Sequence, residues 1–153
     1  MSDGFEFPCE DASIDTALAA SVFTHIDLNT AKRYLRETKR VLKIGGRAIF
    51  SIFALTKDML SEQGSITPLF GTSRPYAWRF RHRGRGFYTH CDELGNPRND
   101  YVPDEIGDPI AYDLEAFTNF CLDAGLTVVE FLPGAWCGRK YMHGYQDMIV
   151  LQS

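Results

Sequence analysis

A strand–helix–strand pattern between residues 14 and 53 constrains the fold of this chain more than any other feature. Ile14 to Ala20 is a short, nearly continuous apolar run, which is typical of a strand buried on both faces of a sheet. Asn29 to Leu42 has helical periodicity, and Arg47 to Phe53 is a second apolar strand. The order strand, helix, strand predicts a parallel βαβ unit, in which function is expected at the carboxyl ends of the strands.

Both ends of this helix carry boundary signals. Asp27 or Asn29 is placed to accept a backbone hydrogen bond at its start, as helix-capping residues do. Gly45 follows its last turn, where a glycine in the left-handed conformation is expected to end the helix. We therefore expect a helix that is capped at its start and stopped by glycine.

The last third of the chain predicts a helix followed by two strands. Asp113 is expected to cap a helix over Leu114 to Ala124, and Gly125 to end it. Leu126 to Leu132 and Gln146 to Leu151 are apolar runs of strand length. Their spacing suits an antiparallel pair that closes one edge of an otherwise parallel sheet.

The middle of the chain differs from both flanks. Residues 54–62 are expected to form a short helix. Residues 64–111 are rich in proline and glycine and contain strand-like residues 76–90, which predicts an inserted hairpin or lid. At 153 residues the whole chain, 1–153, is expected to be a single domain with this insertion.

Composition excludes several classes of protein. The net charge of −4 argues against extensive nucleic-acid binding. The four cysteines form no closely spaced pair, so we expect free thiols and no metal site. The apolar runs fall short of the roughly 20 residues that span a bilayer, and the start lacks the features of a signal peptide. These observations predict a cytoplasmic protein.

Three segments at ordered spacing resemble a known family. Residues 7–15 resemble the entry into the fourth strand of class I S-adenosylmethionine-dependent methyltransferases, and residues 20–26 resemble the loop after that strand. Residues 34–47 resemble the helix and turn before the fifth strand, with Ile44 where proline is usual. Residues 136–139 and 145–147 are similar to the end of the domain in a bacterial branch of the family.

The resemblance implies an α/β fold with the fourth to seventh strands of a Rossmann-like methyltransferase sheet. It implies transfer of a methyl group from S-adenosyl-L-methionine to a small-molecule or glycan-like acceptor. The Gly-rich turn that approaches the cofactor in this family is missing, since the only G-x-G, Gly84-Arg85-Gly86, lies in the insertion and predicts a turn. We therefore expect a C-terminal portion of the domain that binds the cofactor weakly or not at all. Whether it is an active enzyme stays open beside the alternative of a non-catalytic, dimerising interaction module.

The resemblance also places candidate cofactor residues. Asp3 falls where the family has an acid that accepts a hydrogen bond from adenine; the alternative is a plain surface residue at a chain end. Ala20, Ser21 and Val22 fall where the family's loop passes the methionine and ribose parts of the cofactor. Small residues there allow close approach of a ligand, although any strand-to-helix turn also favours them.

Candidate residues for chemistry and for the acceptor come next. His25 is a candidate general base, with packing beside the helix start as the alternative. Methyl transfer depends mostly on proximity and alignment, so a dedicated base is not required. Trp136, Arg139 and Tyr145 crowd the loop before the last strand, where the family walls its acceptor pocket; the alternative is ordinary core packing.

Two surfaces are candidates for partners. In the family's sheet the fourth strand has a neighbour that this chain lacks, so the edge at residues 14–20 is expected to pair with a second copy or to be covered by residues 1–10. Four arginines alternate with aromatic residues and could bind a nucleic-acid backbone or an anionic acceptor, but neighbouring acids favour a solvated hairpin face: Arg79, Arg81, Arg83 and Arg85.

Overall fold

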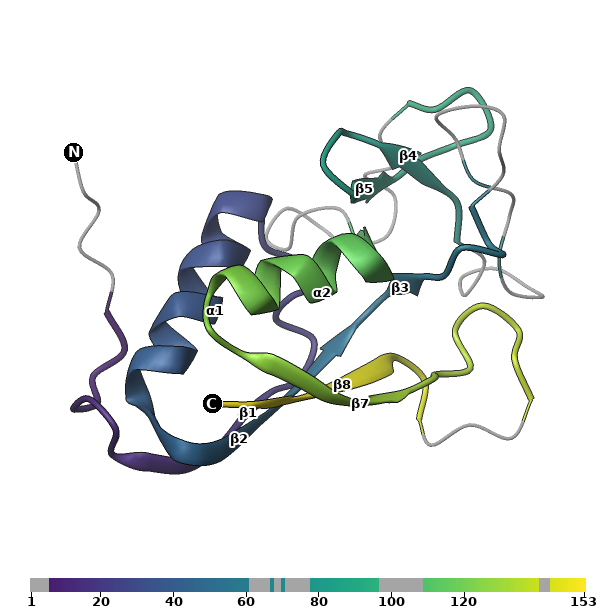
Figure 1. Cartoon of the computed structure of the whole chain (residues 1–153). Helices are drawn as coiled ribbons and strands as arrows, with labels where there is room; N and C mark the ends of the chain where they lie inside the picture. Colours follow the sequence, from purple (N-terminus) through teal and green to yellow (C-terminus); the bar gives the residue numbers. More distant parts are fainter. Residues whose placement is uncertain (1–5, 61–66, 68–69, 71–77, 97–108, 141–143) are drawn as a thin grey trace.

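The computed structural model describes residues 6–60, 67, 70, 78–96, 109–140 and 144–153 (Figure 1). These residues form two helices and two four-stranded sheets. In chain order the elements are β1 (Ile14–Ala19), α1 (Leu28–Val41), β2 (Leu42–Ile52), β3 (Ala54–Leu55), β4 (Phe80–His82), β5 (Phe87–His90), β6 (Ile110–Asp113), α2 (Leu114–Asp123), β7 (Thr127–Leu132) and β8 (Asp147–Gln152).

The first sheet has the strand order β1-β2-β8-β7. β1 and β2 are parallel and are joined by α1, which confirms the expected βαβ unit. β8 lies between β2 and β7 and is antiparallel to both. The expected antiparallel pair at one side of the parallel strands is therefore confirmed.

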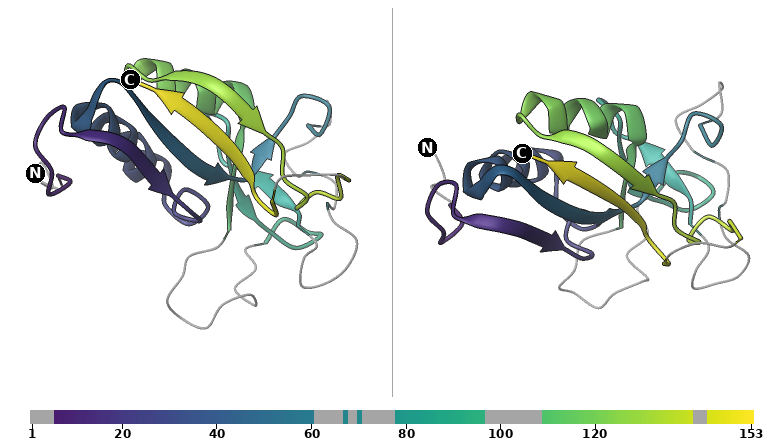
Figure 2. Two further views of the ribbon diagram at one scale, coloured as in Figure 1. Left: turned by 90° about the horizontal axis from the view of Figure 1, so that it is seen from below. Right: turned by 60° about the horizontal axis from the view of Figure 1, so that its bottom comes forward.

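Both helices lie on one face of this sheet, as the two views in Figure 2 show. Ala31, Leu35 and Val41 of α1 recur at helical spacing and are buried, so one apolar stripe packs on the sheet. The Phe23 and Phe50 rings stack with centroids 4.6 Å apart and join the loop after β1 to the core. The same core fixes the loop on which the site is built.

Two aspartates begin the helices as predicted. The Asp27 carboxylate accepts hydrogen bonds from the backbone N–H groups of Asn29 and Thr30 at 2.8 and 3.2 Å. The Asp113 carboxylate accepts one from Ala116 N–H at 2.9 Å. These bonds satisfy N–H groups that have no partner within a helix.

Two local predictions are wrong. Gly45 does not cap α1, because the helix ends at Val41 and the C-cap Leu42 is extended. Gly45 instead has φ of +77° at an irregularity within β2. The helix expected over 54–62 is replaced at residues 54–60 by β3 and a turn, because β3 pairs with β6, a contact that local periodicity does not encode.

The segment before β1 lies along α1. Phe7 N–H donates to Glu37 at 2.8 Å, and Arg40 donates to the carbonyls of Phe7 and Cys9 and to Asp11. Residues 6–10 therefore lie against α1 and not along the outer edge of β1, whereas residues 1–5 of the expected cover lie outside the described residues. Within the described part of the chain β1 pairs only with β2, and the Leu18 side chain is 73% exposed.

The second sheet has the order β3-β6-β5-β4 and contains the expected hairpin. β4 and β5 are antiparallel and are joined at residues 83–86. Gly84, Arg85 and Gly86 all have positive φ, which confirms that this G-x-G is a turn. Residues 61–66, 68–69, 71–77 and 97–108 of the expected insertion lie outside the described residues, so its role as a lid stays a prediction.

Candidate functional site

Three polar side chains meet where β1 and β2 end and β8 begins. Ser21 N–H donates to Ser51 Oγ at 2.6 Å, and Ser21 Oγ donates to Gln146 Oε1 at 3.1 Å. Ser51 Oγ donates to the same Gln146 oxygen at 2.6 Å. This Ser21–Ser51–Gln146 cluster ties the loop after β1 to the neighbouring strand and to the residue that precedes β8.

The loop holds Ser21 in an unusual backbone conformation. Its φ is +57°, in the left-handed region that non-glycine residues seldom adopt. The hydrogen bonds of its N–H, and of its carbonyl with Thr24 Oγ1 at 3.1 Å, hold it there. Strained residues of this kind cluster at functional sites, because the surrounding structure must stabilise them.

The predicted cofactor residues lie on this loop with one exception. Ala20 and Ser21 are exposed at the end of β1, whereas Val22 is half-buried and packs on the core. The loop therefore presents small side chains beside the open strand edge, which fits a close approach of a ligand. Asp3 lies outside the described residues, so its role stays a prediction. The His25 ring is half-buried, and its backbone N–H donates to Val22 O at 3.1 Å.

Asp147, the first residue of β8, is a buried hub. Its carboxylate accepts hydrogen bonds from Ala54 N–H at 2.8 Å, Gly134 N–H at 2.7 Å, Trp136 Nε1 at 2.5 Å and Arg139 Nη1 at 2.6 Å. Burial raises the pKa of the Asp147 carboxyl above its ordinary value, and the donors offset part of that rise. The hub fixes the loop between β7 and β8 against the end of β2.

Glycine is required at position 134 because the backbone of residues 145 and 146 passes too close for a side chain. A Cβ there would lie 2.3 Å from the Gln146 carbonyl carbon and 2.4 Å from the Tyr145 oxygen. The two backbone segments therefore approach more closely than a side chain allows. This approach sets the position of Gln146 in the Ser21–Ser51–Gln146 cluster.

The predicted acceptor residues lie around this hub. Trp136 is only 1% exposed, so it supports the loop from the core. The Tyr145 hydroxyl accepts a hydrogen bond from Trp78 Nε1 at 2.6 Å. Arg139 lies in a hollow of about 340 Å³ that Asp58, Met59, Phe70, Cys137 and Gly138 also line. The structure brings these three residues to one loop, and their roles toward an acceptor stay predictions.

The four arginines of the predicted stripe are divided between two places: Arg79 and Arg81 lie before and within β4, and Arg83 and Arg85 lie in the turn that joins β4 to β5. Trp78 and Phe80 are buried, as the strand alternation read from the sequence predicts, but His82, the third residue of that face, is exposed. Arg81 donates to Gly95 O at 3.1 Å, and Arg83 donates to Thr89 Oγ1 at 2.8 Å. Among the described residues, Arg83 thus bonds within the hairpin, and Arg81 bonds to the turn that follows it.

No group of three His, Cys, Asp or Glu side chains among the described residues is placed to hold a metal ion. All four cysteines have free thiols. Neither α1 nor α2 is long and apolar enough to cross a membrane.

Comparisons with known proteins agree with this architecture. The sequence profile of the family described as "Methyltransferase domain" matches residues 1–50. A methyltransferase from Mesorhizobium loti, described as S-adenosylmethionine dependent, superposes with a TM-score of 0.57 at 11% identity over 97% of this chain and 65% of that one. The chain has a class I methyltransferase fold. The resemblance read from the sequence is thereby confirmed at the level of the fold.

Two further structures bear on this methyltransferase fold. A SAM-dependent methyltransferase from Methanosarcina mazei matches with a TM-score of 0.55 at 15% identity, over 97% of this chain and 63% of that one. The glycopeptide N-methyltransferase MtfA, complexed with (S)-adenosyl-L-methionine, matches with a TM-score of 0.50 at 13% identity, over 92% of this chain and 57% of that one. The chain thus spans less than two thirds of the length of each of these three proteins.

Sequence reasoning missed the residues that organise the site. Ser51 lies within an apolar strand, and Gln146 and Asp147 were recognised only as part of a family-like motif. The one available signal in the sequence was Asp147, an acidic residue at the start of an apolar strand. A carboxylate that is buried with such a strand needs hydrogen-bond donors around it. The identity of those donors depends on three segments that meet only in the folded chain.

Proposed function

We propose that this domain acts in S-adenosyl-L-methionine-dependent methyl transfer to a small-molecule or glycan-like acceptor. The observation that carries the proposal is the loop Ala20–Val22, held by Ser51 and Gln146 at the carboxyl end of β1 within a class I methyltransferase fold. The match to MtfA, which was solved with this cofactor, supports the choice of cofactor. S-adenosyl-L-methionine would supply a methyl group activated by its sulfonium.

The protein itself would contribute to methyl transfer by positioning the cofactor and the acceptor. Ala20 and Ser21 would let the cofactor approach the backbone, and Val22 would anchor the loop in the core. Arg139, in its hollow, would face the acceptor with its guanidinium already oriented by Asp147 at 2.6 Å. Alignment of two reactants can supply much of a rate enhancement, so this arrangement needs no dedicated base. His25 remains a secondary candidate for that role.

The proposal also covers the domain organisation, the cellular location and the self-association of the protein. Residues 1–153 would form one methyltransferase-like domain in which 64–111 act as a lid over the acceptor. The four free thiols support a cytoplasmic location. The open outer edge of β1, with Leu18 exposed, supports self-association by pairing of two β1 strands.

Calorimetry of the whole chain with S-adenosyl-L-methionine tests the proposal. Because the Gly-rich turn is missing, we expect weak but saturable binding, with a dissociation constant between about 0.1 and 1 mM. A stable dimer that gives no heat up to several millimolar cofactor would contradict the proposal. That result would favour the alternative, a non-catalytic interaction module.

A further inference from the structure

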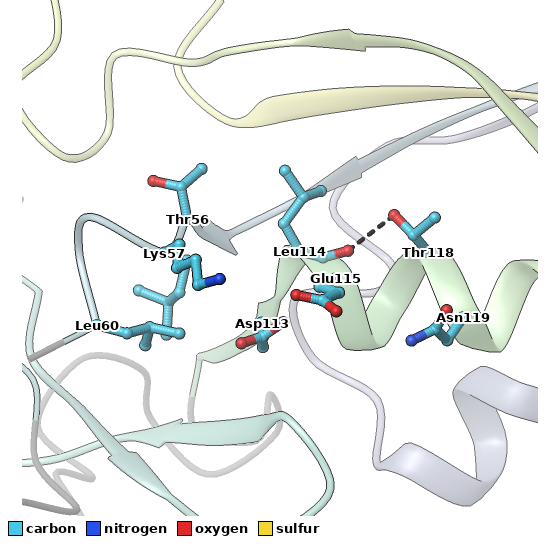
Figure 3. Close-up of a pocket in the computed structure, with 9 residues that line it drawn as sticks. Thr56, Lys57, Leu60, Asp113, Leu114, Glu115, Thr118 and Asn119 are labelled. Carbon is cyan, nitrogen blue, oxygen red and sulfur yellow. Dashed lines mark hydrogen bonds between the residues drawn. The ribbon is translucent and has the colours of Figure 1, made fainter. Parts of the chain in front are cut away.

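A second cleft of the chain lies away from the loop after β1. It has a volume of about 580 Å³ and lies between the turn after β3 and the first turns of α2 (Figure 3). This volume is in the range of small-molecule sites. Nothing in the proposed methyl-transfer site uses it, because Arg139 and its hollow lie on other residues of the 56–60 turn.

The cleft has an apolar wall. Leu55 is fully buried, and Leu60 and Leu114 are half-buried, so their side chains form a surface that is partly removed from water. Thr118 Oγ1 donates to Leu114 O at 2.8 Å, which turns the hydroxyl hydrogen away from the cleft. An apolar group of a ligand would therefore be favoured on this side.

The mouth of the cleft carries separated charges of opposite sign. Lys57 projects from the turn toward Glu115 on the first turn of α2, as Figure 3 shows. Within the described residues neither forms an ion pair. Asp113 adds a second carboxylate, of which one oxygen caps α2 through Ala116 N–H at 2.9 Å. The two sides of the cleft thus offer a cation and an anion that do not neutralise each other.

We propose that this cleft binds a zwitterionic amino-acid-like ligand with an apolar side chain. The ligand's ammonium would pair with Glu115 and Asp113, its carboxylate with Lys57, and its side chain would pack on Leu55, Leu60 and Leu114. A free amino acid and the ends of a short peptide share this chemistry. The inference is independent of the methyl-transfer proposal, because it involves other residues and another ligand.

A titration followed by amide chemical shifts tests this inference on the whole chain. The probes are L-leucine, leucylleucine, 3-methylbutylamine and 4-methylpentanoic acid, which share an apolar group and differ in charge. At least one zwitterion is expected to saturate shifts at residues 57, 115 and 118 with a dissociation constant at least tenfold lower than that of the amine or the acid. The relative affinities of leucine and leucylleucine distinguish a free amino acid from a peptide.

Matched variants complete the test. Lys57→Met and Glu115→Gln are each expected to weaken zwitterion binding about tenfold or more, because each removes a charge-assisted hydrogen bond. Lys140→Met and Glu130→Gln remove exposed charges outside the cleft and should leave binding unchanged. Both pocket positions are exposed, so the variants should fold, and circular dichroism checks this. Absence of shifts at 10 mM zwitterion, or equal affinity for the amine and the zwitterion, would overturn the inference.

Discussion

Arg139 Nη1 donates to the fully buried Asp147 carboxylate at 2.6 Å, and this ion pair joins the loop between β7 and β8 to the first residue of β8. Removing one partner of a buried ion pair usually costs more than the pair contributes, because the other partner is left without compensation. Gln146, the residue before Asp147 in the chain, belongs to the Ser21–Ser51–Gln146 cluster of the proposed site. The stability of the hub and the geometry of the site are therefore connected.

Asp147→Asn is expected to lower the free energy of unfolding by about 3 kcal/mol, because an amide cannot accept from all four donors. Denaturant unfolding measures the change. Asp15→Asn is the matched control, since Asp15 pairs with Lys43 at 2.7 Å but is 79% exposed, and it should change stability by less than about 1 kcal/mol. Equal effects of the two substitutions would show that the hub is not structural.

Gln146→Leu is expected to weaken binding of S-adenosyl-L-methionine about tenfold. The substitution removes the oxygen that accepts from both Ser21 and Ser51, and the strained loop then loses part of its support. Calorimetry measures the affinity of both proteins. Gln152→Leu, at the far end of β8, is the matched control and should bind like the unmodified chain. An unchanged affinity of the Gln146→Leu protein would show that the Ser21–Ser51–Gln146 cluster does not support cofactor binding.

Leu18→Lys is expected to abolish self-association through the β1 edge. A charge at an edge strand opposes pairing with another chain, and Leu18 is 73% exposed there. Sedimentation velocity at several concentrations reports the oligomeric state. Leu122→Lys, at a 53% exposed position on α2, should leave association unchanged. Dimers that persist in Leu18→Lys would place the interface elsewhere.

Asp27 gives the chain a defined response to acid. The hydrogen bond from the Thr30 hydroxyl is the main cause that lowers the pKa of the Asp27 carboxyl in the folded state. The contribution of the Asp27 carboxylate to the free energy of unfolding is complete above about pH 4. It is lost as the pH falls below that value, because the carboxyl takes up a proton at a higher pH in the unfolded chain than in the folded one.

Asp27→Asn keeps a capping oxygen but does not titrate. As the pH falls from 7 to 3, the free energy of unfolding should therefore decrease less for the variant than for the unmodified protein. Urea unfolding at the two values measures this, and parallel losses in both proteins would contradict the assignment. Asp27→Ala should cost about 1 kcal/mol at pH 7.

Local signals in the sequence predicted the first sheet, and they predicted only the β4–β5 hairpin of the second. The apolar runs at β1 and β2 and the caps Asp27 and Asp113 depend on neighbours in the chain. β3 has two residues and exists only through its pairing with β6, more than fifty positions later. Periodicity within a short window carries no information about such a contact.

The site was predictable only in part for the same reason. A family resemblance pointed to the loop at Ala20–Val22, and the fold confirmed its place at the end of β1. The donors that hold Ser21 and Asp147 come from distant segments, so neither bonding pattern could be read from the sequence. The close approach of Gly134 to Gln146 depends on how the loop between β7 and β8 folds, so the sequence did not reveal it.

The most direct test of the central proposal is a titration of the whole chain with S-adenosyl-L-methionine, followed by amide chemical shifts. The account predicts saturable shifts at Ala20, Ser21 and Val22, with smaller ones at Ser51 and Gln146 through the hydrogen bonds that join them. Absence of shifts at about 5 mM cofactor, or shifts confined to residues far from the carboxyl end of β1, would contradict it.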